Sequence, residues 1–149
     1  MYITFGHMLE VGIHRLEEAK IADAKRDAET LLLYLEKADR TFLYVHRNDA
    51  TDEYRADAYF GLIDRRAAGE PLQYILGSQE FMGLNFAVNP SVLIPRQDTE
   101  TLVELALKRV GEKKRSLSIL DMCCGSGAIL CRTAVTVISA RSAAAAIIT

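Results

Sequence analysis

Gly125 and Gly127, in the stretch ILDMCCGSGAIL (119–130), are the residues whose type and spacing most clearly suggest chemistry. Glycine has no Cβ, so the backbone of such a turn can adopt unusual torsions and come close to a ligand. The N–H groups that open the following helix point toward the same place. Asp121, at the carboxyl end of the preceding predicted strand, could accept a hydrogen bond from the ligand or offset a positive charge on it. These features predict a site for a nucleotide-like cofactor.

The same turn has a simpler interpretation. Two glycines two positions apart after a strand also suit a tight strand-to-helix connection that binds nothing. A dinucleotide is a less attractive ligand, because the first glycine of the G-x-G-x-x-G pattern has no clear counterpart here.

The elements around the turn predict the fold that would position it. Asp98 or Thr99 can cap a helix that has Glu100 in its first turn. A buried strand at SLSILDM (116–122), the glycine turn and another helix follow. This order is the opening of an open α/β sheet of Rossmann type. One face of the first helix carries Val103, Leu107 and Val110.

The residues from the start to about Gly69 predict a small bundle of short amphipathic helices, because hydrophobic residues recur there at helical spacing. Asp39 could cap a short helix, and Thr51 with the acidic pair after it is a start signal for another. Gly69 would end that helix, and Pro71 would prevent its continuation. The hydrophobic stripes are Leu9, Ile13 and Leu16; Ala28, Leu31, Leu32 and Leu35; and Tyr59, Leu62 and Ile63.

The hydrophobic period changes between Leu72 and Pro95. LQYILG (72–77) is rich in residues that favour strands, and EFMGLNFAVN (80–89) alternates apolar and polar positions at Phe86 and Val88. We expect a β-hairpin or short meander, too small to fold alone, that joins the bundle to the segment with the glycine turn.

Composition limits the class of protein. The chain has 149 residues, 50% hydrophobic and 26% charged, which suits a soluble globular protein of one or two small domains. The net charge of -2 provides no general basic field for nucleic acid. The basic stretch KRVGEKKR (108–115) is better explained as a solvated helix end than as a nucleic-acid patch.

Cysteine use favours a reducing cytoplasm. Three cysteines, two of them adjacent at Cys123 and Cys124, form neither a disulfide framework nor a zinc pattern. The first residues do not resemble a signal peptide, and no stretch has the length and apolarity of a membrane span. The three histidines match no catalytic element, and we interpret them as surface or packing residues: His7, His14 and His46.

Two long stretches carry a specific resemblance. GEPLQYILGSQEFMGLNFAVNPSVLIPRQDTETLVELAL (69–107), followed by ILDMCCGSGAI, closely resembles the peptide chain release factor glutamine methyltransferases of the PrmC/HemK type. The similarity extends from about Leu9 to Leu130 and includes RDAETLLLYLE in the helical zone.

The resemblance implies an S-adenosylmethionine-dependent enzyme that methylates the side-chain amide of the glutamine in the Gly-Gly-Gln motif of peptide chain release factors. It implies a helical release-factor-binding domain at 1–70, a β-hairpin linker at 71–95 and the start of a methyltransferase domain at 96–149. The expected fold is therefore α+β followed by α/β, with an incomplete Rossmann-like class I methyltransferase domain. We expect a cytoplasmic monomer that contacts neither membrane nor nucleic acid.

The resemblance also assigns cofactor-binding residues. The glycine loop has Cys123 where the family commonly has glycine, and Gln97 stands where proline is usual. Without the resemblance, Phe81 could be only a core aromatic, and Thr99 with Glu100 only a helix cap. The positions that match the family's loop, F-x-G element and IPR-x-x-TE element are Asp121, Cys123, Gly125, Gly127, Phe81, Gly83, Pro95, Arg96, Thr99 and Glu100.

The sequence departs from the family in its last part. The Asn-Pro-Pro-Tyr motif that orients the target amide is absent, and no acidic residue follows Asp121 to hold a cofactor ribose. The tail after Leu130 ends in an alanine run without turn signals. We interpret it as a truncated or frameshifted sequence, and a natural short protein with a divergent end is the alternative.

Three hypotheses follow. The first is a release factor methyltransferase represented by a catalytically incomplete chain. The second is a non-catalytic module that binds release factor through the helical bundle. The third is a relative that methylates adenine in nucleic acid, against which the acidic composition and helical N-terminal zone argue.

Overall fold

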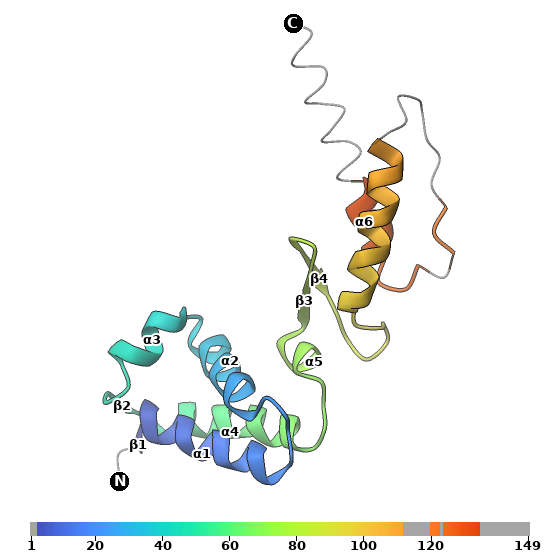
Figure 1. Cartoon of the computed structure of the whole chain (residues 1–149). Helices are drawn as coiled ribbons and strands as arrows, with labels where there is room; N and C mark the ends of the chain where they lie inside the picture. The colour runs from blue at the N-terminus through green and yellow to red at the C-terminus, as the bar shows by residue number, and fades with distance from the viewer. Residues whose placement is uncertain (1–2, 112–119, 123, 135–149) are drawn as a thin grey trace, which may run out of the picture. The chain divides into compact units, whose positions relative to one another are not determined.

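The computed structural model describes residues 3–111, 120–122 and 124–134. The chain divides into two compact units, Met1–Leu76 and Gly77–Thr149. Figure 1 shows the helices and strands of both units. Each unit has its own hydrophobic core, so each can be understood from its own residues. None of the helices among the described residues is long and apolar enough to span a membrane.

The first unit is helical and contains two very short strands. Strands β1 and β2 pair antiparallel, with Ile3 opposite Thr51. Two residues per strand are too few to produce a period in the sequence, so these strands were not predicted. The elements are β1 (Ile3–Thr4), α1 (Phe5–Glu18), α2 (Ala24–Glu36), α3 (Arg40–Val45), β2 (Ala50–Thr51), α4 (Glu53–Ala67) and α5 (Leu72–Leu76).

Side-chain caps begin two of these helices close to where the sequence predicts. The Asp39 carboxylate accepts the N–H of Thr41 at 2.9 Å, which confirms the predicted cap of α3. At α4 the capping residue is Asp52, whose carboxylate accepts the N–H of Arg55 at 2.8 Å. The start signal was therefore correct, but Thr51 itself lies in β2 and does not cap the helix.

The predicted stripes form the core of this unit, which confirms the helical bundle. Leu16, Ala28, Leu31 and Leu32 are fully buried, as is Ile63 from α4, while the other stripe positions pack around them. Burying such side chains is the main favourable contribution to folding, at roughly 25 cal/mol per Å² of apolar surface.

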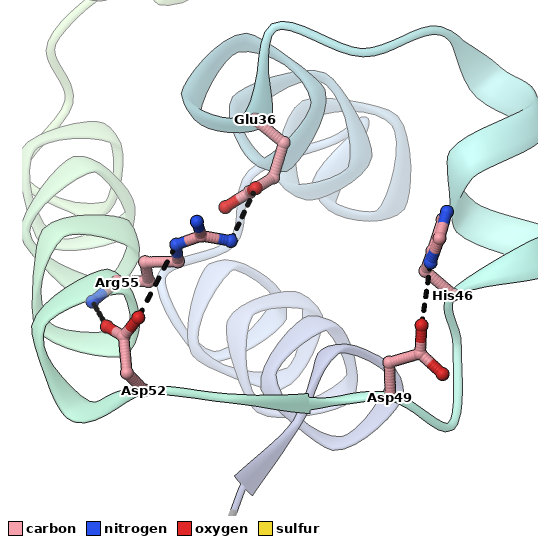
Figure 2. Close-up of polar contacts among 5 residues, drawn as sticks. All are labelled: Glu36, His46, Asp49, Asp52 and Arg55. Carbon is pink, nitrogen blue, oxygen red and sulfur yellow. Dashed lines mark hydrogen bonds and ion pairs between the residues drawn. The ribbon is translucent and has the colours of Figure 1, made fainter.

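Polar pairs connect α2 with α4. Arg66 donates to the buried Asp27 at 2.7 Å. Near the other end of α2, Arg55 donates to Glu36 at 3.2 Å and also contacts the cap residue of its own helix (Figure 2). The two pairs link α2 and α4 at two places along α2.

The segment LQYIL corrects one prediction. Leu72–Leu76 forms the short helix α5, not a strand. The N–H groups of Tyr74 and Ile75 both donate to the carbonyl oxygen of Pro71, and Gly77 leaves the helix with a φ of 72°. One helical turn buries Ile75 in the bundle core, so tertiary packing overrides the strand preference of these residues.

The second unit begins with a β-hairpin, as predicted. Its two strands both lie after LQYIL, which is not part of it. Strands β3 (Ser78–Phe81) and β4 (Leu84–Ala87) pair antiparallel, with Phe81 opposite Leu84 across a two-residue turn. Phe81 and Val88 are buried, whereas Asn85 and Ala87 are exposed. The alternation in the sequence therefore identified the buried face.

Helix α6 (Gln97–Gly111) follows the hairpin. It starts earlier than predicted, so Asp98 and Thr99 lie inside its first turn and are not its caps. Val103 is fully buried, as expected. The side chain of Val110 lies outside the described part of the chain.

Most of the predicted strand at 116–122 also lies outside the described residues. Its last residues, 120–122, are not in a strand. Leu120 and Met122 are 83% and 79% exposed, which contradicts the burial expected for them. The Rossmann-type sheet stays a prediction.

Candidate cofactor site

A cavity of about 330 Å³ in the second unit brings two of the predicted motif segments together. One wall comes from the chain before and at the start of α6, and the other from the glycine turn, about thirty residues later. Known small-molecule sites are of this size or larger. The lining residues are Leu93, Ile94, Pro95, Arg96, Thr99, Cys124, Gly125, Ser126, Ala128 and Ile129.

The glycine turn has the backbone that its sequence predicts. Gly125 and Gly127 have φ values of 53° and 74°, in the left-handed region that other residues rarely adopt. The N–H of Gly127 donates to the carbonyl oxygen of Cys124 at 2.7 Å, and residues 128–134 are helical. The first N–H groups of this helix have no partner within it, so they suit a polar or anionic ligand group.

The opposite wall is shaped by backbone turns. The carboxamide of Asn89 accepts the N–H of Ser91 at 2.9 Å, which turns the chain toward the cavity wall. The N–H of Thr99 donates to the carbonyl oxygen of Arg96 at 3.0 Å as α6 begins. Arg96 is exposed, so its guanidinium is accessible to a ligand with a carboxylate or phosphate group.

Phe81 and Gly83 do not line the cavity. Phe81 is 1% exposed and forms a hydrophobic cluster with Val103 and Ala128. This cluster packs the hairpin against α6 and against the helix after the glycine turn. Gly83 has a φ of 81° and occupies the β3–β4 turn. In this structure Phe81 is therefore a core aromatic residue, which is the simpler of its two interpretations.

Glu100 also lies outside the cavity lining. Its carboxylate oxygen Oε1 accepts the N–H of Met82 at 3.3 Å. It therefore contacts the hairpin turn, in addition to its place in the first turn of α6. Met82 has a φ of 49°, which is unusual for a residue with a side chain. The sequence did not predict this conformation.

Asp121 and Cys123 precede the glycine turn. Asp121 has a buried carboxylate oxygen, Oδ2, with no hydrogen-bond partner among the described residues. A buried carboxylate oxygen normally has a partner, and Asp121 lies outside the residues that line the cavity. Cys123 lies outside the described residues.

The helical unit is similar to the N-terminal domain of PrmC-type proteins. Residues 7–77 match the family model of the PrmC N-terminal domain. This match covers the helical unit up to the start of the hairpin.

Curated relatives extend the match beyond that domain. The chain is 43% identical over 122 residues to the release factor glutamine methyltransferase of Clostridium botulinum, covering 82% of this chain and 43% of the relative. It is 46% identical over 114 residues to that of Geobacter sulfurreducens, covering 76% and 39%. The Escherichia coli protein is 37% identical over 127 residues, covering 85% and 44%.

These matches confirm the resemblance drawn from the sequence. Over the part that it shares with them, the chain is similar to the release factor glutamine methyltransferases, and it spans about two fifths of their length.

Proposed function

We propose that this chain carries the release-factor-binding domain and the first part of the S-adenosylmethionine site of a release factor glutamine methyltransferase. The main support for this proposal is that residues of the IPR-x-x-TE segment and of the glycine turn line the same cavity. The names of the relatives support the choice of reaction, and the cavity supports the choice of these residues as part of the cofactor site.

The residues of the cavity, together with Gly127 of the glycine turn and Asp121 before it, suit this cofactor. Gly125 and Gly127 allow close approach of a ligand to the backbone, and the following helix presents N–H groups. The free carboxylate oxygen of Asp121 would accept a hydrogen bond from the ribose or the ammonium group. Arg96 and Thr99 would contact the cofactor from the opposite wall.

When bound, the cofactor supplies a methyl group activated by a sulfonium, so the protein needs to position the target nitrogen more than to deprotonate it. In the proposed reaction that nitrogen is the side-chain amide of the glutamine in Gly-Gly-Gln. The Asn-Pro-Pro-Tyr sequence expected to orient this amide is not among the 149 residues. We therefore expect these residues alone to bind the cofactor weakly and to transfer no methyl group.

A groove on the helical unit is the candidate contact surface for release factor. It encloses about 410 Å³ between α1, α2 and α3, with Leu9, Ile13 and Leu43 beside the exposed Tyr44. Charged side chains of both signs line it, and Arg47 is paired with Glu10 at 2.7 Å, so the groove suits a partner surface with both polar and apolar groups. The other charged residues of the lining are Lys25, Glu29 and Arg40.

The two parts of the proposal can be tested separately. Calorimetric titration with S-adenosylmethionine should show binding to the chain, and its loss in a Gly125→Val variant. No binding at any accessible concentration would contradict the cofactor assignment.

For the partner, capture of purified release factor should weaken in a Tyr44→Ala variant. The matched control is Tyr54→Ala, since Tyr44 and Tyr54 are both 84% exposed but only Tyr44 lines the groove. Equal capture by both variants would exclude the groove. Capture without cofactor binding would favour the non-catalytic binding module, and binding of DNA in place of release factor would favour the nucleic-acid hypothesis. We expect a monomer acting in the cytoplasm.

A further inference from the structure

The turn between β3 and β4 contains an unusual backbone conformation. Met82 and Gly83 have φ values of 49° and 81°, as a tight two-residue hairpin turn requires. Glycine tolerates this conformation, but methionine has a Cβ and adopts it at an energetic cost. Such a residue persists only where its surroundings hold it in place.

Two carboxylates hold this turn. The N–H of Gly83 donates to Glu80 Oε1, from the neighbouring strand β3. The N–H of Met82 donates to Glu100 Oε1 at 3.3 Å, from the first turn of α6. The second contact is not local, because eighteen residues separate the donor and the acceptor.

The packing around Glu100 makes this contact a link between two elements. Val103 lies three residues further along α6, on the same side of the helix, and packs against Phe81 from the hairpin. Thr99, adjacent to Glu100, lines the cavity. The same helical turn therefore contacts the hairpin through one residue and the cavity through the next.

We propose that Glu100 is a positioning residue that holds Met82 in the left-handed conformation and thereby fixes the hairpin to the cavity wall at the start of α6. This role replaces the direct cofactor contact that the family resemblance implies for Glu100. Only the consequence for the cofactor rests on the proposed function; the link between Glu100 and the turn does not.

Amide hydrogen exchange measured by NMR tests the link directly. In a Glu100→Ala variant the amide of Met82 loses its acceptor, so its exchange should accelerate on the order of tenfold, as expected for loss of one hydrogen bond. A Glu100→Gln variant keeps an acceptor oxygen and should retain most of the protection. The matched control is Glu104→Ala, one turn later on α6 and exposed, which should leave this amide unchanged. Equal exchange in the Glu100→Ala and Glu104→Ala variants would overturn the proposal.

A second substitution tests whether Glu100 acts through Met82. Glycine takes the required φ without strain, so in a Met82→Gly background the hairpin should survive the Glu100→Ala change. The cross-strand contact between Gln79 and Phe86 reports on this hairpin. If Glu100→Ala disrupts that contact equally in both backgrounds, Glu100 does not act by holding residue 82.

Cofactor binding is measured in a separate experiment. Glu100→Ala should weaken S-adenosylmethionine binding severalfold, and Glu100→Gln should restore it. Unchanged binding together with lost protection of Met82 would overturn the link to the cavity wall. A wild-type chain that binds no cofactor would contradict the proposed function instead, and the exchange data would still decide the role of Glu100.

Discussion

Gly12 of α1 lies directly against Tyr59 of α4. A Cβ added to Gly12 would stand 2.3 Å from the phenolic oxygen and 2.9 Å from two ring carbons of Tyr59. Burial raises the pKa of Tyr59 well above its ordinary value, so the phenol stays protonated. Its O–H donates to the carbonyl oxygen of Ala28 at 3.3 Å, so one ring connects three helices.

A Gly12→Ala substitution should therefore destabilise the helical unit, although alanine favours helices more than glycine does. Overpacking of this kind lowers the free energy of unfolding by about 1–3 kcal/mol. The control is Gly61→Ala in α4, where an added Cβ has no atom within 4 Å. That change should raise the free energy of unfolding by roughly 0.5–1 kcal/mol. Urea denaturation of both variants measures the difference, and a shift of the same sign in both would refute the close contact.

The Asp27–Arg66 pair should matter more than exposed pairs of the same geometry. Asp27–Arg66 and Glu10–Arg47 both have a nitrogen–oxygen distance of 2.7 Å, but the carboxylate side chains are 8% and 61% exposed. Asp27→Asn should lower the free energy of unfolding by about 2–3 kcal/mol, because a largely buried charge loses its partner. Glu10→Gln should change it by less than about 1 kcal/mol. If both substitutions change the free energy of unfolding equally in denaturant experiments, burial does not determine how much an ion pair contributes to stability.

The Arg65–Glu70 pair predicts a pH dependence. Both guanidinium contacts, at 2.8 and 2.6 Å, lower the pKa of Glu70 below its usual 4.5. The folded state thus favours the ionised carboxylate, so its contribution to stability is fully present above 4.5 and is lost as the pH falls through the lowered folded-state pKa. The stability difference between the wild type and a Glu70→Gln variant should shrink in acid. A difference that stays constant through this range would argue against the pair.

Gly127 should be required for its torsion, because it lies between two residues that line the cavity, Ser126 and Ala128. Gly127→Val places a branched side chain at a φ of 74°, which should distort the glycine turn and abolish cofactor binding in calorimetry. Gly69→Ala is the control, because Gly69 has a φ of 93° but belongs to the helical unit. It should lower the melting temperature and leave cofactor binding intact. Loss of binding in both variants would indicate a general effect of instability.

Much of this fold follows from patterns that extend over a few residues. The stripe around Leu31 and Leu32, the cap at Asp39 and the alternation around Phe86 each report a local preference for burial or hydrogen bonding. The structure has each of them as predicted. Such preferences act within one element, so they can be recognised without knowing its neighbours.

Predictions from the sequence were wrong where contacts with residues far along the chain determine the local structure. Strand-favouring residues at Leu72–Leu76 form a helix because one turn buries Ile75 in the bundle. Thr51 looked like a cap but pairs with Ile3 in a two-residue ladder that has no period to detect. The contact between the carboxylate of Glu100 and the hairpin turn could not be read from the family motif.

The sequence by itself determined the helical bundle, the hairpin, the glycine turn and the family resemblance, because each depends on residue type and spacing along the chain. Only the tertiary structure decided that residues before and at the start of α6 line one cavity with residues of the glycine turn, and that Tyr59 occupies the space left by Gly12. The physical reason is that close packing and hydrogen bonding depend on distances in space, and residues far apart in the chain acquire those distances only when it folds.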